Sequence, residues 1–345
     1  MRPALKAGLL PLWRDRDTVQ IGVDPRRAAA LTGLGKAAAV LTLLDGSRDS
    51  DEVIAAAQAY GISPEATNHV LGLLAKAGAL QDFPASLHRS LPGYLRARLA
   101  PEMACASLAY CDGDGGARTV ARRRNAYVRV HGADRIGACV ATFLAASGVA
   151  RVNCLDAEVA GPADLTPAGL GEADLGKPRA AGVARAIRRV APEVRTDDEG
   201  SYPDLVVLTG AGSHDEELLR SLMRDRTAHL AVRAGEAIGV VGPLVDPGRS
   251  ACLRCVNITK AALDPAWPAV LAQSRAAVPQ ACDTVLAAAT AALASAQALA
   301  FLDGAGPAPA AANGTLELVL PHWQWRRRTW AAQPSCTCGA ASNVP

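Results

Sequence analysis

Aromatic side chains are scarce in this chain of 345 residues: Phe, Trp and Tyr together make up 4%, and there are only three methionines. Half of the residues are nevertheless apolar, with many alanines among them. The core is therefore expected to consist mainly of small aliphatic side chains. The length allows two or more domains, each with its own core.

Net charge is also low, at +3 over the whole chain, and only five residues are lysines. At this net charge, and without a basic tail, nothing indicates a nucleic-acid or acidic-membrane partner. The first residues, MRPALKAGLLPLWRDRD, lack the apolar core and the small-residue cleavage site of a secretory signal. A cytoplasmic location is therefore expected.

Long hydrophobic runs are missing apart from residues 285–302. That run is free of charge and nearly long enough to span a bilayer, but it is mostly alanine, with Thr290, Ser295 and Gln297 interspersed. We interpret it as a buried helix of a soluble protein, so no membrane partner is expected.

Nine cysteines are present, and in a reducing compartment they favour free thiols or metal ligands over disulfides. Cys252 and Cys255 form a C-x-x-C pair, and Cys336 and Cys338 form a C-x-C pair. Two such pairs on tight loops can supply the four corners of a tetrahedral zinc site with no open position, which would be structural. The alternative is that the four are reduced bystander thiols, since C-x-C requires a tighter loop.

Three further cysteines lie in or beside predicted elements. Cys139 falls in a predicted helix and Cys154 in a predicted strand, where a thiol packs as a small apolar group. Cys282 precedes the alanine-rich helix, whose N-terminus could lower its pKa and make it a nucleophile. No partner base is evident near Cys282, so core packing is the alternative.

Residues 1–83 indicate a small N-terminal domain. Short strands are predicted at residues 9–13, 18–23 and 27–31, and three helices follow: residues 36–44, a helix capped by Ser50, and a helix from Ser63 to Gly78. Short strands combined with three helices are typical of a winged helix.

Residues 84–124 are predicted to be a helical connector, and residues 125–345 a Rossmann-like domain. Strand and helix patterns alternate from Asn125, which predicts a mostly parallel sheet with helices on both faces. Two closing strands, residues 315–320 and 323–330, predict a C-terminal hairpin that the four-cysteine site would staple. The fold class is therefore α/β.

A glycine turn is the most informative local motif, within YVRVHGADRIGACVATFLAASGVARVNCLD at residues 127–156. A strand, the turn, a helix and a second strand ending at Asp156 follow the order of a dinucleotide- or ATP-binding βαβ unit. The middle glycine of that motif is Asp134 here. Its carboxylate is expected to project toward the position of a polyphosphate and to repel it, so ATP is not expected as a cofactor.

Residues 125–345 resemble the ThiF-type superfamily, the fold of ubiquitin-activating enzymes and of enzymes that adenylate sulfur-carrier proteins. The shared features are the glycine turn, ASGVARVNCLD, the Gly-Lys-Pro step at residues 176–178, DLVVLT and the two cysteine pairs. The resemblance implies nucleotide contacts at Asp156 and Lys177. It also shows losses, because residues 163–166 lack the phosphate-binding arginine and residues 209–210 lack a magnesium-binding carboxylate.

The two retained residues have a structural alternative: Asp156 could cap the end of its strand, and Lys177 could lie in the first turn of the following helix. The nucleotide site is accordingly interpreted as vestigial.

Residues 1–83 resemble the PqqD-like peptide-recognition module, on the strands and on LLDGSRDSDEVIAAA and VLGLLAKAGAL. A winged helix can also bind DNA, but nine basic and nine acidic residues leave this segment without a basic stripe. A peptide can instead add a strand to the sheet edge. The resemblance places the peptide contacts on that edge and on the third helix, at Arg27, Ala29, Leu31, Thr32, Val70 and Leu74.

The whole chain is similar to the Ocin-ThiF-like partner proteins of YcaO cyclodehydratases. That resemblance implies a non-catalytic scaffold that binds a precursor's leader peptide and presents the core peptide to a separate YcaO enzyme, which uses ATP to form azolines in thiopeptide-type and related natural products. ThiF-type proteins commonly pair, so a homodimer is also considered.

Two other functions are left open. The first is an active ThiF-type, ATP-dependent adenylyltransferase that acts on a peptide or carrier-protein C-terminus. The second is a regulator that binds DNA through the winged helix.

Overall fold

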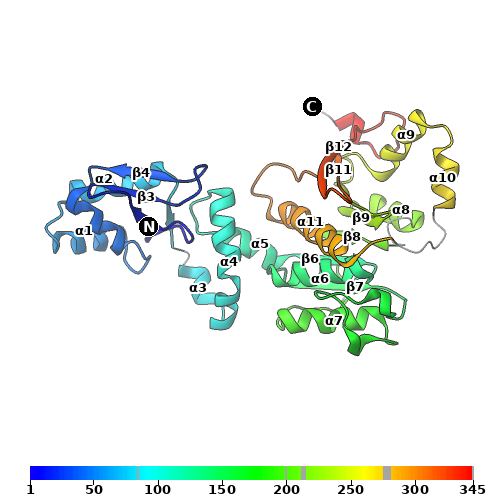
Figure 1. Ribbon diagram of the computed structural model, residues 1–345, viewed down its shortest axis with the longest axis horizontal. Helices are drawn as coiled ribbons and strands as arrows, with labels where there is room; N and C mark the ends of the chain where they lie inside the picture. Colours follow the sequence, from blue (N-terminus) through cyan, green and yellow to red (C-terminus); the bar gives the residue numbers. More distant parts are fainter. Residues whose placement is uncertain (84, 199, 211–214, 275–280, 344–345) are drawn as a thin grey trace. The chain divides into compact units, whose positions relative to one another are not determined.

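The computed structural model describes residues 1–83, 85–198, 200–210, 215–274 and 281–343 (Figure 1). The chain divides into two compact units, Met1–Ala121 and Arg122–Pro345, called unit 1 and unit 2 below. Residues 84–121, expected to be a connector, group with unit 1. One reason is Lys6, whose buried ammonium donates a hydrogen bond to the carbonyl oxygen of Ser107 at 3.0 Å. The Ser107 hydroxyl in turn donates to Gln81 at 2.7 Å.

Unit 1 contains two small antiparallel sheets, one of three strands in the order β2-β3-β4 and one that pairs β1 with β5. The strands are β1 (Pro3–Leu5), β2 (Pro11–Trp13), β3 (Thr18–Ile21), β4 (Ala29–Thr32) and β5 (Leu80–Asp82). The three predicted strands are confirmed as β2, β3 and β4. The β1–β5 pair was not predicted, because strands of three residues carry almost no periodicity.

The helices of unit 1 include the three that the sequence predicts. They are η1 (Gly35–Leu43, a 3-10 helix), α1 (Ser50–Gln58), α2 (Pro64–Lys76), α3 (Ala85–Ser90) and α4 (Gly93–Tyr110). Ser63 caps α2 as predicted, but α1 is capped by Asp49 rather than Ser50, because Asp49 and Glu52 form a reciprocal capping box. That unit 1 is a winged helix of the PqqD-like kind stays a prediction.

Unit 2 is built on a seven-stranded sheet in the order β12-β11-β10-β9-β8-β6-β7. The strands are β6 (Tyr127–His131), β7 (Arg151–Leu155), β8 (Leu205–Leu208), β9 (His229–Gly235), β10 (Ile238–Val245), β11 (Gly314–Val319) and β12 (Gln324–Thr329). Strands β7, β6, β8 and β9 run parallel, and β10 to β12 extend the sheet antiparallel. The α/β class and the C-terminal hairpin are confirmed. The antiparallel half follows from the short β9–β10 and β11–β12 connections, which cannot carry a parallel crossover.

Helices cover both faces of the parallel strands, as predicted. The helices from the unit boundary onward are α5 (Ala117–Asn125), α6 (Arg135–Ala146), α7 (Arg179–Val190), α8 (Glu216–Arg224), α9 (Leu253–Leu263), α10 (Trp267–Gln273) and α11 (Thr284–Asp303), with short 3-10 turns η2 (Pro162–Asp164), η3 (Glu172–Asp174) and η5 (Ala340–Asn343). Leu205 and Val207 of β8 belong to the core that α6, α7 and α11 close. Val206 and Leu208 point the other way and pack against Leu222 of α8.

Of the described helices, α11 is the one long and apolar enough to cross a membrane. Within unit 2 it packs against α6, β9 and β10. Leu286, Ala287, Ala291, Ala294 and Ala298 along one side of α11 are completely buried in the core. The prediction of a buried helix is therefore confirmed.

A buried ion pair joins the end of α5 to the end of α11. The Arg123 guanidinium donates two hydrogen bonds to the Asp303 carboxylate, at 2.7 and 2.8 Å, and the Asp303 side chain has no exposed surface. Removal of either partner would leave an unpaired buried charge, which commonly costs about 3–5 kcal/mol. The pair therefore holds the α11 C-terminus in register with the start of unit 2.

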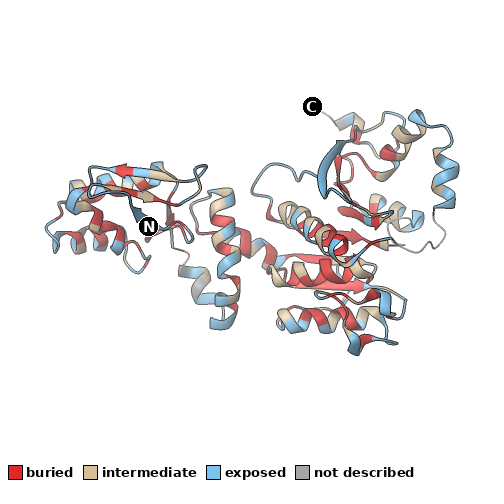
Figure 2. Cartoon of the chain, in the orientation of Figure 1, coloured by how far each residue is buried: buried red, intermediate tan, exposed pale blue. Residues whose placement is uncertain are grey.

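Strand β12 forms an open edge of the large sheet and is exposed along its whole length (Figure 2). Three consecutive arginines occupy its centre. Two of them, Arg326 and Arg328, pair with Glu317 on β11 at 2.6 and 3.0 Å. The edge therefore carries a dense positive charge that is only partly neutralised.

Candidate functional site

The glycine turn after β6 keeps its shape because its neighbours leave no room for side chains. Gly132 has a φ of +101°, and a Cβ atom there would lie 2.4 Å from the Thr209 hydroxyl. A Cβ atom on Gly137 would lie 2.0 Å from the Gly132 carbonyl oxygen. The Thr209 hydroxyl donates to the carbonyl oxygens of His131 and Gly132, both at 3.1 Å. Internal packing alone thus explains why these glycines are present.

Asp134 is the N-cap of α6. Its Oδ1 accepts hydrogen bonds from the backbone N–H groups of Ile136 at 3.1 Å and Gly137 at 2.9 Å. The sequence-based expectation was that this carboxylate projects toward a phosphate; instead it turns back onto its own helix. It occupies the amide donors that a phosphate at a helix N-terminus would use.

Asp156 follows β7 directly and binds the same loop. Its carboxylate accepts from the N–H of Ala133 at 2.6 Å and from that of Glu158 at 2.7 Å. Together, Asp134 and Asp156 satisfy three loop and helix amides, at Ala133, Ile136 and Gly137. The interpretation of Asp156 as a structural cap fits these contacts.

Lys177 lies outside α7, which begins two residues later at Arg179, so its expected place in the first helical turn is wrong. Pro178 at the N-cap keeps Lys177 out of the helix, because the proline ring disfavours the α conformation for the residue before it. The exposed Lys177 ammonium donates to the Ala173 carbonyl oxygen at 2.7 Å.

Arg179 is a cation of this site that the sequence did not single out. Its guanidinium donates through Nε and Nη2 to the Asp164 carboxylate, both at 2.9 Å, and lies 3.9 Å from Asp156. Asp164 is buried and belongs to the segment that lacks the expected phosphate-binding arginine. The sequence signal that could have identified Arg179 is its position, two residues after Lys177. In this arrangement the cation is held by the protein's own carboxylate.

Burial dominates the electrostatics of Asp134. Its Oδ2 is sealed from solvent and has no hydrogen-bond partner among the residues described. Burial raises the pKa of Asp134, and the hydrogen bonds from Gly137 and Ile136 only partly oppose that rise. The carboxyl group therefore holds its proton more tightly in the folded protein than in an unfolded chain.

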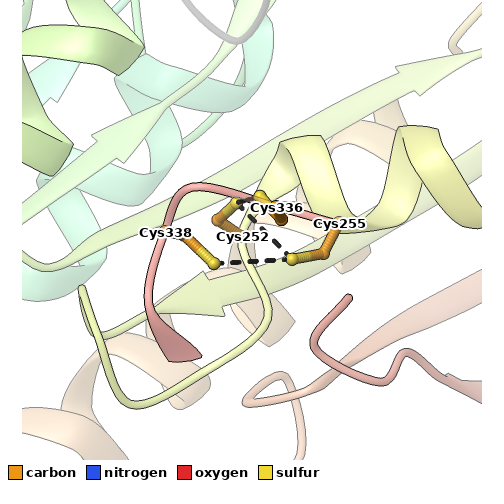
Figure 3. A group of neighbouring side chains, drawn as sticks. All are labelled: Cys252, Cys255, Cys336 and Cys338. Carbon is orange, nitrogen blue, oxygen red and sulfur yellow. Dashed lines mark hydrogen bonds between the residues drawn. The ribbon is translucent and has the colours of Figure 1, made fainter. Parts of the chain in front are cut away.

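The four paired cysteines converge at one place (Figure 3). Cys252 is the N-cap of α9 and Cys255 lies in its first turn, whereas Cys336 and Cys338 belong to the segment after β12. Their sulfur atoms all lie within 4.8 Å of one another, and three of the four side chains are buried. The N–H of Gln333 donates to the Cys255 sulfur at 3.4 Å. This cluster could hold a metal ion, since soft thiolates favour such binding.

The remaining cysteines have different surroundings. Cys139 and Cys154 are buried in the unit 2 core, which confirms their predicted packing role. Burial raises the pKa of Cys282 to about 11 despite the nearby Arg135 guanidinium. The Cys282 side chain belongs to the unit 2 core, and Asp283, not the sulfur, caps α11, so these contacts favour core packing over the nucleophile hypothesis.

Half of the predicted peptide-contacting residues lie in the core of unit 1. Leu31 is 6% exposed, and Val70 and Leu74 are completely buried. Their side chains offer no surface to a peptide, which corrects the prediction; apolar residues at helical spacing face the core here rather than a groove.

The other three predicted contacts lie on the surface at or beside β4. Ala29 is half-buried, Thr32 is exposed, and the exposed Arg27 donates a hydrogen bond to the carbonyl oxygen of Leu108. Their role in peptide binding stays a prediction.

Strand β4 is an open edge of the three-stranded sheet. The N–H of Gly33, just after β4, donates to the carbonyl oxygen of Asp17, just before β3, at 3.0 Å. Because bonded and non-bonded pairs alternate along an antiparallel ladder, the backbone groups of Ala30 and Thr32 point away from β3. This edge can therefore accept another strand.

Comparison with known proteins identifies the central segment. Residues 113–199 match the ThiF family, so the chain contains a ThiF family domain. No curated protein sequence matches this chain.

Among solved structures, E. coli MccB with AMPCPP and MccA is similar at a TM-score of 0.71 and 17% identity, covering 99% of this chain and all of that one. The microcin C7 biosynthetic enzyme MccB with N-formylated MccA gives a TM-score of 0.70 and 16% identity, covering 98% and 100% of the two chains. PaaA is similar at 0.62 and 16% identity over 76% of this chain and 91% of its own. At these identities the likeness establishes the fold.

The raised pKa of Asp134 predicts a pH-dependent effect of Asp134→Asn. Above the unfolded pKa of about 3.9, the unfolded state binds fewer protons than the native state, so the free energy of unfolding falls as pH rises. The asparagine keeps an acceptor for both amides but cannot ionise. We therefore expect the difference in melting temperature, variant minus wild type, to increase as the pH is raised from about 4 to about 8.

Asp283→Asn is the matched control, because Asp283 is an exposed N-cap whose carboxylate accepts from Leu286 N–H at 2.7 Å. Its melting-temperature difference should vary much less over the same range. A pH-independent difference for Asp134→Asn would contradict the buried-carboxylate interpretation.

Proposed function

We propose that this protein is a peptide-binding scaffold without adenylation activity, which captures the leader of a ribosomally synthesised precursor and presents the peptide to a separate YcaO cyclodehydratase in the cytoplasm. The observation that carries this proposal is the glycine turn, whose amides are bound by Asp134 and Asp156. A ThiF-type fold is thus combined with a phosphate-binding loop that its own carboxylates occupy.

A peptide partner is supported by the structural neighbours. MccB, a microcin C7 biosynthetic enzyme, has been solved with N-formylated MccA, and its fold corresponds to almost the whole of this chain. The YcaO partner rests on the resemblance of the full chain to YcaO partner proteins. The PqqD-like character of unit 1 belongs to the same proposal, and pairing of two copies stays a prediction.

The charges around the turn support the absence of adenylation. A phosphate at the turn would find the N–H groups of Ile136 and Gly137 bound by Asp134 and that of Ala133 bound by Asp156. Arg179, a cation close to Asp156, is already bound to Asp164. Lys177 is bound to a carbonyl oxygen instead. Both of these cations are thus engaged by the protein's own groups.

The open edge of β4 supplies the means of peptide capture. Ala30 and Thr32 direct backbone donors and acceptors away from β3, and the side chains of both residues are exposed. An extended leader peptide could pair with these groups as a fourth strand, with affinity from the main chain. This mode does not need the buried side chains of Leu31, Val70 and Leu74.

The strand-addition mode predicts the effect of Ala30→Pro. Proline removes an N–H that points to the open edge but breaks no bond to β3, so unit 1 should keep its fold. We expect the variant to bind a fluorescently labelled cognate leader at least about tenfold more weakly than wild type, as measured by fluorescence anisotropy on the full chain.

Ala30→Val is the matched control, since it enlarges the same side chain while it keeps the N–H. It should bind within a factor of about two of wild type. No saturable binding of the leader to wild type would refute leader capture, and equal binding by Ala30→Pro would refute this edge.

An active adenylyltransferase is the second candidate, because a structure of E. coli MccB with ATP is among the similar folds and Asp156 and Lys177 are retained here. ATP–pyrophosphate exchange in the presence of substrate peptide separates the two functions. The scaffold proposal expects neither exchange nor ATP binding by calorimetry. Exchange that Lys177→Ala abolishes would establish the adenylating function instead.

The cysteine cluster is proposed to bind a structural zinc ion. A tetrahedral zinc site with Zn–S bonds of about 2.3 Å has sulfur–sulfur edges of about 3.8 Å. The observed separations are 3.8 Å for Cys252–Cys255, 3.6 Å for Cys252–Cys336 and 3.6 Å for Cys255–Cys338. Four protein ligands leave no open position, so zinc would join α9 to the C-terminal segment and take no part in chemistry.

The zinc proposal predicts that the purified protein contains about one equivalent of zinc by elemental mass spectrometry. Cys252→Ser and Cys336→Ser should each lose the metal and melt at lower temperature, because the small core around Trp330 and Val256 then loses its cross-link. Cys111→Ser, at an exposed cysteine far along the chain, should change neither quantity. Unchanged zinc content in both cluster variants would overturn the assignment.

A further inference from the structure

Unit 2 contains a cleft of about 1470 Å³ that extends well beyond the glycine turn. Its walls come from β9, β10 and β11 on one side and from α8, α9 and α10 on the other, and its lining extends from Asp134 to the cysteine cluster. Sites for single small molecules usually measure roughly 300–1,000 Å³. The described lining thus encloses enough space for an extended peptide segment.

The wall of this cleft combines apolar surface with positive charge. Leu219 and Met223 of α8 and Trp267 of α10 supply apolar and aromatic surface, whereas Val240 of β10 and Trp330, which also line the cleft, are largely buried. The lining also contains six Lys or Arg side chains against four Asp or Glu side chains. The surplus is positive, which favours an acidic ligand.

Lys260 of α9 is the central cation of the wall. Its ammonium lies 4.3 Å from the centre of the Trp267 ring and 5.8 Å from that of Trp330, so two aromatic faces hold it in place. In the described part of the chain, no carboxylate lies within ion-pair distance of it. The Lys260 charge is therefore positioned by the protein but not neutralised by it.

Arg233 of β9 adds a second uncompensated charge. It is exposed, lines the same cleft, and makes no ion pair with any residue that the structure describes. The nearby Glu317 is already bound by Arg326 and Arg328. Burial lowers the pKa of Lys260, and the positive charges of Arg233 and Arg328 lower it further, against a smaller opposing effect of the Glu317 carboxylate.

We propose that this cleft binds an acidic segment of a linear peptide, with a carboxylate between Lys260 and Arg233 and apolar side chains against Trp267 and the α8 side chains. The apolar wall and the size of the cleft favour a peptide over a free phosphate. The inference goes beyond the proposed function, because it places a second peptide contact in unit 2, independent of the β4 edge.

The test uses the full chain and two blocked, fluorescently labelled peptides that alternate Leu with Asp or, in the second peptide, Leu with Asn. The Asp peptide should bind saturably, more weakly as salt is raised, and at least about tenfold more tightly than its Asn counterpart. Lys260→Gln and Arg233→Gln should each weaken binding of the Asp peptide by about tenfold, whereas Lys260→Arg should retain most of it.

Arg249→Gln is the matched control: Arg249 is 81% exposed in its side chain, pairs with Asp246 and lies outside the cleft lining, so its loss should leave the affinity unchanged. Arg233 is exposed, so Arg233→Gln keeps the test valid if Lys260→Gln fails to fold. Ala30→Pro should bind the Asp peptide like wild type, which separates this site from the β4 edge. The proposal would be overturned if the two peptides bind equally or if neither binds. It would also be overturned if both cleft variants keep the wild-type affinity, or if inorganic pyrophosphate binds more tightly than the Asp peptide.

Discussion

The backbone amides at the start of α6 need acceptors, and most of the chemistry of unit 2 depends on how that need is met. A helix N-terminus leaves several N–H groups without partners inside the helix. In a nucleotide-binding protein the ligand can supply the acceptors; here Asp134 and Asp156 supply them permanently. The same contacts that complete the βαβ unit therefore occupy amides that a phosphate would otherwise use.

The remainder of unit 2 keeps the architecture without that ligand. Thr209 closes the glycine turn from β8, the Arg123–Asp303 pair fixes the end of α11, and the cysteine cluster joins α9 to the C-terminal segment. None of these contacts involves a nucleotide. These contacts stabilise unit 2 without a bound nucleotide, as the proposed scaffold function requires.

Local patterns carried much of the sequence-based prediction. Strands β6 and β7, the closing hairpin and the paired cysteines were predictable because each depends on neighbours a few residues apart. The direction of the Asp134 side chain was not, because it depends on helix amides that become available only once α6 has formed. Arg179 escaped notice because its partner, Asp164, lies 15 residues away. Val70 and Leu74 were misplaced because helical spacing identifies an apolar face but not what covers it.

Two open strand edges in this protein are built differently. Along β12, Arg326, Arg327 and Arg328 would bring like charges together if a second β12 approached, which opposes uncontrolled sheet growth between molecules. Strand β4 has the sequence AALT, with no charge to repel an incoming strand. The chain thus discourages self-association at one edge and leaves the other open to an extended partner. At high protein concentration, that uncharged edge is also the place where unwanted aggregation would begin if no peptide covered it.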